Sequence, residues 1–379
     1  MLLFTQINFP AFLYQSAYHL IIFVLCALTS IYYSFSHDQK LSFGINGKFL
    51  NYAGIFLMLS VTVFLGLRPV DLVFVDTQLY ADMYNIIDEY EEIRWDNNWM
   101  WHGIIVFCKS LGFNVNQYFL LIESVYIGSL FFVCLKVSRH NFWLAALFFF
   151  SSFSFYSYGV NGLRNGMACH IVLLGILLLA NRDKKWLPVG LLLFAFAYTI
   201  HKSILLPFIC MLASFYIKDV KNAIAIWGIS ILLSLIIGNA FGDFIQSIGL
   251  FEDKLSYFND VEESYLKGRF SQTGFRFDFL LYSAMPVLMI WYLTIKRNFK
   301  DNVYTILANT YLLANSFWIL VIRATFSNRF AYLSWFIYPI IIFYPLIRMN
   351  IWEKQDRKTA LILILYSGFT FFMEFIYYG

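Results

Sequence analysis

Long apolar runs, separated by short polar turns, recur along the whole sequence. A helix that crosses a bilayer needs about 20 mostly apolar residues. Runs of about this length are found near residues 11–35, 49–67, 115–135, 141–158, 160–180, 186–201, 203–217, 223–241, 277–296, 303–322, 330–348 and 360–378. We therefore predict an all-α, polytopic membrane protein of roughly 12 transmembrane helices, forming a single integral membrane domain over residues 1–379.

Composition supports this class and excludes several others. Only 13% of the 379 residues are charged, against about 25% in a soluble domain. No basic stripe or recognition motif points to nucleic acid. The five cysteines are scattered and form no CxxC pair, which argues against a disulfide scaffold and a zinc site. We expect no metal and no cofactor. The run at 11–35 is too long for a signal peptide, so we interpret it as a retained helix.

The distribution of basic residues predicts the orientation. Loops rich in Lys and Arg stay in the cytoplasm. Alternate short loops here are basic, and they carry Lys40, Lys48, Lys136, Arg139, Arg182, Lys184, Lys185, Lys218, Lys221, Lys296, Arg297, Lys300, Arg348, Lys354, Arg357 and Lys358. Both termini and the two long loops, 68–98 and 242–276, are then expected to face outward. The Trp-rich stretch from Trp99 to Phe113 suits an interfacial helix better than a span.

Five arginines lie at the outward ends of predicted helices, against the positive-inside trend: Arg68, Arg164, Arg276, Arg323 and Arg329. Each could extend to a lipid headgroup as a simple anchor. The guanidinium is, however, a planar fork of donors that stays charged and matches phosphate. Five such side chains on one side favour a shared anionic ligand.

His201 ends the predicted span 186–201, and Arg164 begins the span before it. Both lie about 15–17 residues from the cytoplasmic turn 181–185, so at 1.5 Å per residue each rises roughly 23–26 Å. The two side chains should therefore reach similar depth near the outer face. A histidine there could accept a proton, or help an arginine to hold phosphate when protonated.

Acidic residues and tyrosines supply further candidates. Asp76 and Tyr80 belong to the first long outer loop, where a carboxylate beside aromatic rings suits a sugar. Glu123 is an acid well inside a predicted span. Intramembrane acids are costly and often functional, although Glu123 could equally pair with a buried arginine or hydroxyl for structural reasons.

Three short patterns occur in order along the chain, and a fourth follows them. They are Arg68 with Asp76-x-x-x-Tyr80, then Gly162-Leu-Arg164-Asn-Gly166-Met-Ala168, then Ala197-Tyr-x-x-His201-Lys-Ser203, and finally the Arg- and Tyr-rich segment from Arg323 through Arg329 to Tyr332. Together they resemble the EpsG-like branch of the Wzy-type polysaccharide polymerases. Two positions depart from the usual pattern of that branch, because Val75 stands where a Gly is common and Asn165 replaces a Gln.

The resemblance implies a membrane glycosyltransferase of the GT-C type, with substrates linked to a polyprenyl diphosphate. A growing glycan on undecaprenyl diphosphate would be the donor, and a lipid-linked repeat unit would be the acceptor. Members typically act in O-antigen, capsule or exopolysaccharide assembly at the bacterial inner membrane, with the site facing outward. A chain-length-regulating membrane protein is a possible partner.

Such a reaction displaces a lipid diphosphate from an anomeric carbon. Fixed cations stabilise the charge that gathers on the leaving group. The residues assigned to binding of the diphosphate or the glycan are therefore the five outward arginines, Arg68, Arg164, Arg276, Arg323 and Arg329, together with Tyr80 and Tyr332. The acceptor hydroxyl needs a base, for which His201 and Asp76 are the candidates. The alternatives are a lipid-linked oligosaccharide flippase, an O-antigen ligase or another lipid-diphosphate glycosyltransferase, and lastly an acyltransferase. A flippase would call for cations in a central cavity and two related halves.

Overall fold

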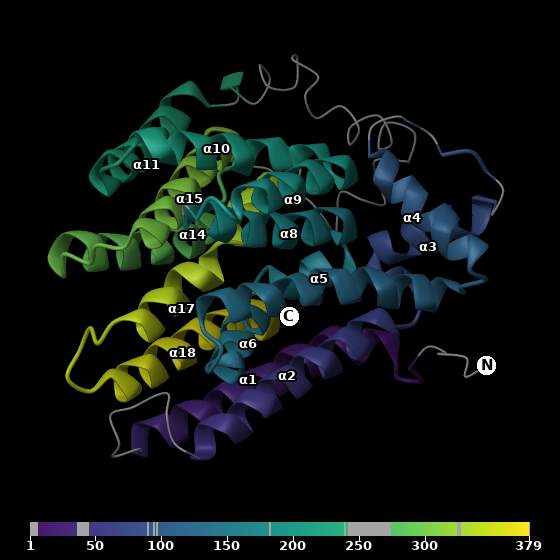
Figure 1. Ribbon diagram of the computed structural model, residues 1–379, viewed down its shortest axis with the longest axis horizontal. Helices are drawn as coiled ribbons and strands as arrows, with labels where there is room; N and C mark the ends of the chain where they lie inside the picture. Colours follow the sequence, from purple (N-terminus) through teal and green to yellow (C-terminus); the bar gives the residue numbers. More distant parts are fainter. Residues whose placement is uncertain are drawn as a thin grey trace. The chain divides into compact units, whose positions relative to one another are not determined.

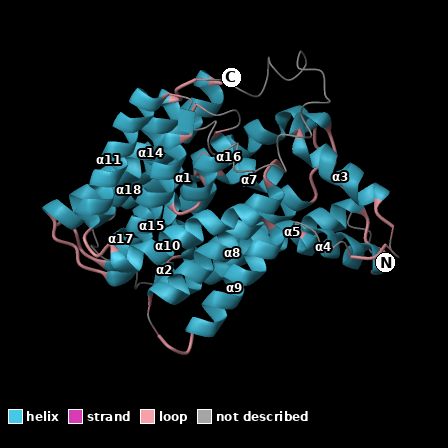
Figure 2. Cartoon of the chain, turned by 90° about the horizontal axis from the view of Figure 1, so that it is seen from above, coloured by secondary structure: helices cyan, strands magenta, loops and turns pink. Residues whose placement is uncertain are grey.

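A computed structural model describes residues 7–35, 45–88, 91–93, 95, 98–181, 183–238, 240–241, 274–323 and 327–378. Within these ranges the chain forms helices, turns and loops, and no strand (Figure 2). Nine helices of this part are long and apolar enough to cross a membrane. The prediction of an all-α membrane protein with many spans is confirmed. Most of the predicted outer loop 242–276 lies outside the described residues.

The chain divides into two compact units, the first comprising residues up to Ile204 and from Ile342 onward. Its elements are α1 (Ala11–Phe35), α2 (Ile45–Gly66), η1 (Leu72–Phe74), α3 (Asp76–Ile86), α4 (Trp99–Ser110), α5 (Val115–Val137), α6 (Phe142–Phe150), α7 (Phe155–Val160), α8 (Leu163–Ala180), α9 (Leu187–Ile200), η2 (Lys202–Ile204), α18 (Gln355–Phe372) and η6 (Met373–Tyr377). Helix α1 packs on α18, α2 packs on α5 and α6, and α8 packs on α5 and α9 (Figure 1). Helix α8 is the most enclosed of the candidate spans.

The second unit covers Leu205 to Ile341. Its elements are α10 (Leu205–Tyr216), α11 (Val220–Ile237), α14 (Phe277–Trp291), η5 (Tyr292–Lys296), α15 (Asn302–Leu320) and α16 (Asn328–Trp335), and α17 (Tyr338–Arg348) starts in this unit and ends in the first. Helix α15 contacts α10, α11, α14 and α16 and so forms the centre of the unit.

Two predicted spans are interrupted in the structure. The segment 330–348 has a turn at Phe336 and Ile337 between α16 and α17, which together still count as one candidate span. The segment 141–158 is not a continuous helix but two short ones, α6 and α7, with a turn from Ser151 to Ser154 between them. The Ser151 hydroxyl donates to the carbonyl of Leu147 at 2.6 Å, and the Ser152 and Ser154 hydroxyls lie 3.3 Å apart. Serine side chains that bond to nearby backbone and to each other compete with helix continuation. The nine long helices and two shorter apolar helices, α9 and α10, fall on the other eleven predicted segments.

Loops predicted to share a side of the membrane lie at the same end of the helices in the first unit. At one end, the Asn51 side chain donates to the carbonyl of Arg139 at 2.6 Å. At the other end, the Asn116 side chain donates to the carbonyl of Arg68 at 3.1 Å. Arg139 belongs to a loop predicted as cytoplasmic, and Asn51 is near the start of the predicted span 49–67 that follows another such loop. Arg68 belongs to the first predicted outer loop, and Asn116 is at the start of the predicted span 115–135.

Candidate functional site

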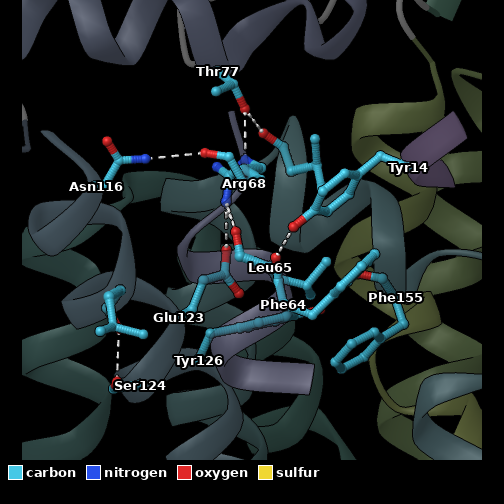
Figure 3. Close-up of polar contacts among 12 residues, drawn as sticks. Tyr14, Phe64, Leu65, Arg68, Thr77, Asn116, Glu123, Ser124, Tyr126 and Phe155 are labelled. Atoms are coloured by element: carbon cyan, nitrogen blue, oxygen red, sulfur yellow. Dashed lines mark hydrogen bonds and ion pairs between the residues drawn. The ribbon is translucent and has the colours of Figure 1, made fainter. Parts of the chain in front are cut away.

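Arg68 lies just beyond the end of α2 and is completely buried, with 0% of its surface exposed. Its Nη1 donates to the carbonyl of Leu65 at 2.5 Å and lies 3.4 Å from Glu123 Oε1. Its Nε donates to the hydroxyl of Thr77 at 3.1 Å (Figure 3). Burial lowers the pKa of Arg68 and the Glu123 carboxylate acts in the opposite direction. Because a guanidinium stays protonated in proteins, Arg68 is a buried cation with one carboxylate beside it.

Helix α3 starts at Asp76, directly after a strained residue. Val75 has φ 44° and ψ −91°, close to a γ-turn that is rare for a residue with a side chain. A β-branched residue at positive φ is a genuine outlier. This is the position where the resemblance expects a glycine, and glycine would adopt this φ without steric cost. The turn sets the direction of α3 and with it the places of Asp76 and Tyr80.

Arg164 lies in the first turn of α8, facing α3. Its guanidinium carbon is 5.8 Å from the centre of the Tyr80 ring. The side chains of Asp76 and Tyr118 lie within electrostatic reach of the same guanidinium. The structure thus brings the predicted residues Asp76, Tyr80 and Arg164 together at one end of the first unit. The Nε atom of Arg164 is buried and has no hydrogen-bond partner among the described residues.

A close approach of α7 to α8 holds Arg164 in place. A Cβ atom added at Gly166 would lie 2.9 Å from both the carbonyl oxygen and the Cβ of Tyr158. Gly166 therefore permits the tight connection that places Arg164 at the start of α8. Asn165, at the second departure from the family pattern, is buried and accepts a hydrogen bond from the Cys169 thiol at 3.3 Å.

His201 follows the last residue of α9 and is 8% exposed. Helix α9 runs antiparallel to α8, with Gly190 against Leu179 and Phe194 against Gly175. The η2 turn after His201 also contacts α8. This geometry supports the expectation that His201 lies at the same end of the hairpin as Arg164.

The hydrogen bonds of His201 determine its tautomer. The backbone N–H of Ser203 donates to His201 Nδ1 at 3.2 Å, and the Ser203 hydroxyl lies 2.6 Å from the same nitrogen. Since a backbone N–H is only a donor, Nδ1 must accept and carries no proton. The neutral imidazole then carries its proton on Nε2.

The remaining predicted residues belong to the second unit. Arg276 is paired with Asp278 through two hydrogen bonds, of 2.9 Å from Nε and 2.6 Å from Nη2, and its guanidinium lies 3.6 Å from the Phe279 ring centre. The Arg323 guanidinium lies 5.6 Å from the Phe275 ring centre, and its buried Nε has no hydrogen-bond partner in the described part of the chain. Arg329 and Tyr332 lie half-buried on α16, where the Tyr332 ring is 5.6 Å from that of Trp335.

Two residues of this region were missed or left open by sequence reasoning. Thr77 is completely buried, and its hydroxyl donates to the carbonyl of Val160 at 2.8 Å. Nothing in the sequence distinguishes this threonine from others. Glu123 could be singled out from the sequence because it is an acid inside an apolar run. The structure shows that it faces the buried guanidinium of Arg68. Over the described residues, no three His, Cys, Asp or Glu side chains come together as a possible metal site.

The fold and the site define a multi-span α-helical membrane protein with arginine, carboxylate and tyrosine side chains gathered at one end of its first unit. The chain belongs to the EpsG family, whose family model matches residues 51–379. This match confirms the resemblance found in the motifs and associates the chain with membrane polysaccharide polymerases. No curated protein and no solved structure matches the chain.

Proposed function

We propose that this protein is a GT-C-type glycosyltransferase that polymerises polysaccharide repeat units on the outer face of the bacterial inner membrane. It would transfer a growing glycan from undecaprenyl diphosphate to a lipid-linked repeat unit. Membership of the EpsG family supports the class of reaction. The observation that carries the proposal is the placement of Arg164 beside Tyr80 and within electrostatic reach of Asp76.

In the proposed reaction an acceptor hydroxyl oxygen attacks the anomeric carbon of the donor sugar. The bond from that carbon to the phosphate oxygen breaks, and the lipid diphosphate leaves with the electron pair. Arg164 would stabilise the growing negative charge, because a fixed cation beside the leaving group acts where charge develops. The acceptor hydroxyl loses its proton to a base, for which we propose the Asp76 carboxylate.

His201 takes a different role in this proposal. Its Nδ1 accepts from Ser203, so the neutral ring presents an N–H at Nε2 and not a basic lone pair. Such a group donates a hydrogen bond to a phosphate or sugar oxygen. We therefore propose His201 as a ligand of the diphosphate or of the sugar, with Asp76 as the base.

The second unit would contribute further ligands. Arg323 and Arg329 are proposed to bind the diphosphate or the glycan, and Tyr332 to contact a sugar ring. Arg276 is also proposed as a ligand, although its pairing with Asp278 neutralises part of its charge locally. A chain-length-regulating membrane protein remains the proposed partner.

The proposal is tested with purified protein and a synthetic lipid-linked repeat unit in lipid vesicles. We expect the wild-type protein to form a ladder of polymers. Arg164→Ala should lower polymer formation per folded molecule by about 10²–10³-fold, the usual cost of losing one charge-stabilising donor. Arg164→Lys should recover little of that loss, because an ammonium lacks the planar fork.

Three outcomes contradict the proposal. A wild-type protein that moves the repeat unit across the membrane and forms no ladder is a transporter. Transfer of the glycan only to an acceptor other than a second repeat unit identifies a ligase. Wild-type activity in Arg164→Lys, at equal folded protein, would show that the guanidinium does not bind the diphosphate through its fork.

A further inference from the structure

The burial of Arg68 separates it from the other predicted ligands. Its exposed fraction is 0%, whereas Arg164 lies half-buried at the start of α8. Two of its three guanidinium nitrogens are engaged inside the protein, with Leu65 and Glu123 at Nη1 and Thr77 at Nε. Its cation also lies 4.7 Å from the centre of the Phe119 ring. A side chain enclosed in this way cannot reach a lipid diphosphate without leaving these partners.

Glu123 gives Arg68 the counter-charge that such burial requires. An isolated cation in a low-dielectric interior costs several kcal/mol, and a paired carboxylate offsets much of that cost. Glu123 is itself 0% exposed. A Cβ atom added at Gly159 would lie 3.3 Å from Glu123 Oε2, so the carboxylate is packed against the helix that precedes α8.

Thr77 connects this ion pair to the elements that carry the candidate site. Its hydroxyl accepts from Arg68 Nε at 3.1 Å (Figure 3). The same hydroxyl donates to the carbonyl of Val160 at 2.8 Å. One hydroxyl therefore joins three segments, namely the chain after α2, the first turn of α3 and the end of α7. Asp76 directly precedes Thr77, and Tyr80 is one turn further along α3. Val160 lies four residues before Arg164.

We propose that Arg68, Glu123 and Thr77 are positioning residues, which hold α3 against the α7–α8 connection and so set Asp76 and Tyr80 relative to Arg164. This inference rests on the proposed function and deepens it by assigning Arg68 an internal role in place of contact with the substrate. Displacement of a reacting group by about 1 Å can lower a rate by 10²-fold. Arg68, Glu123 and Thr77 would prevent such a displacement of Asp76 and Tyr80, and they would make no contact with the substrate themselves.

The experiment uses the full-length protein in lipid nanodiscs and the pair Thr77→Val and Thr77→Ser. Valine keeps the shape and removes the hydroxyl, whereas serine keeps the hydroxyl. Spin labels at Leu79→Cys on α3 and Lys202→Cys on η2, both exposed positions of the first unit, report how α3 lies relative to the end of the α8–α9 hairpin. We expect one narrow distance distribution in the parent protein and in Thr77→Ser, and a broadened or shifted one in Thr77→Val.

Activity gives the second measurement. Thr77→Val should lower kcat per folded molecule by about 10-fold or more with KM little changed, as expected when only the reacting geometry is lost. Thr77→Ser should stay within about 3-fold of the parent. Ser124→Ala is the matched control, because it also removes a hydroxyl that donates to a backbone carbonyl, that of Leu120 at 2.6 Å, but on the exposed face of α5. It should leave both measurements unchanged.

The two measurements separate the inference from the function on which it rests. An unchanged distance distribution in Thr77→Val overturns the positioning role, whatever the activity shows. A loss of folded protein in Thr77→Val, with normal kcat and distances for the molecules that remain, also overturns it and leaves a purely structural threonine. A wild-type protein without polymerase activity contradicts the proposed function. A shifted distance distribution in Thr77→Val would still support the positioning role of Arg68, Glu123 and Thr77.

Discussion

Each of the two units contains a junction, a group of buried polar side chains that joins several helices. One junction is charged and the other is neutral. The junction of the first unit is ionic, formed by Arg68 and Glu123 with Thr77 beside them. The junction of the second unit is neutral and centres on Asn315 of α15, which is also completely buried.

The neutral junction satisfies its hydrogen-bonding groups. The Asn315 amide nitrogen donates to the hydroxyls of Ser283 and Ser334 at 3.1 and 3.0 Å, and its carbonyl oxygen accepts from the Trp227 indole at 2.8 Å. The Trp335 indole donates to Ser283 at 2.8 Å. Four helices, α11, α14, α15 and α16, are joined in this way. A fully connected polar network makes packing specific and rigid.

The ionic junction is less complete. Arg68 Nη2 and Glu123 Oε2 are buried and have no hydrogen-bond partner among the described residues. A buried ion pair is seldom more stable than apolar residues of the same volume. We infer that the first unit retains its ionic junction for the position of α3, whereas the neutral junction of the second unit contributes to stability.

The largest expected effect comes from removing one charge of the ionic junction. Glu123→Ala leaves Arg68 buried without a counter-charge and should cost about 3–5 kcal/mol of unfolding free energy. The double variant Arg68→Met with Glu123→Leu should regain most of that stability and still lack polymerase activity. Thermal unfolding in detergent and polymer yield per folded molecule are the two measurements. If the double variant is active, the ion pair has no role beyond stability.

A smaller effect is expected from the neutral junction. Asn315→Leu leaves the Trp227 indole N–H without its acceptor, which costs about 1–3 kcal/mol. The Ser334 hydroxyl still donates to the carbonyl of Ala331, and the Ser283 hydroxyl still accepts from the Trp335 indole. We expect lower thermal stability and unchanged activity per folded molecule. If Asn315→Leu instead lacks polymerase activity per folded molecule, as expected for the double variant of the ionic junction, the two junctions do not differ in role.

The smallest effect on stability is expected at Val75, the strained residue before α3 in the first unit. Val75→Gly relieves the positive φ before α3 and should raise stability by about 1 kcal/mol, since a strained backbone residue costs about 1–3 kcal/mol. Gly112→Ala is the reverse control, because Gly112 has φ 70° with open space around it, so a side chain there adds only backbone strain. Equal stability of Val75→Gly and the parent protein would show that the strain is compensated locally.

Residue spacing alone predicted a good part of the candidate site. The apolar runs and basic loops placed Arg68, Asp76 and Tyr80 at the same end of the chain's helices as Arg164, because span length and loop charge are local properties. Asp76, Tyr80 and Arg164 are together in the structure. The continuous span at 141–158 was wrong, because apolar composition does not reveal where serine side chains compete with the helix backbone.

The sequence by itself determined the helical membrane architecture, the family and the arginine, carboxylate and tyrosine side chains available for chemistry. Only the tertiary structure decided which of them lie together and what each one contacts. It enclosed Arg68 with Glu123, made Thr77 the link between α3 and α7, and turned the acceptor nitrogen of His201 toward Ser203. The physical reason is that hydrophobicity and charge act through local composition, whereas a hydrogen bond or an ion pair needs atoms from distant segments at about 3 Å.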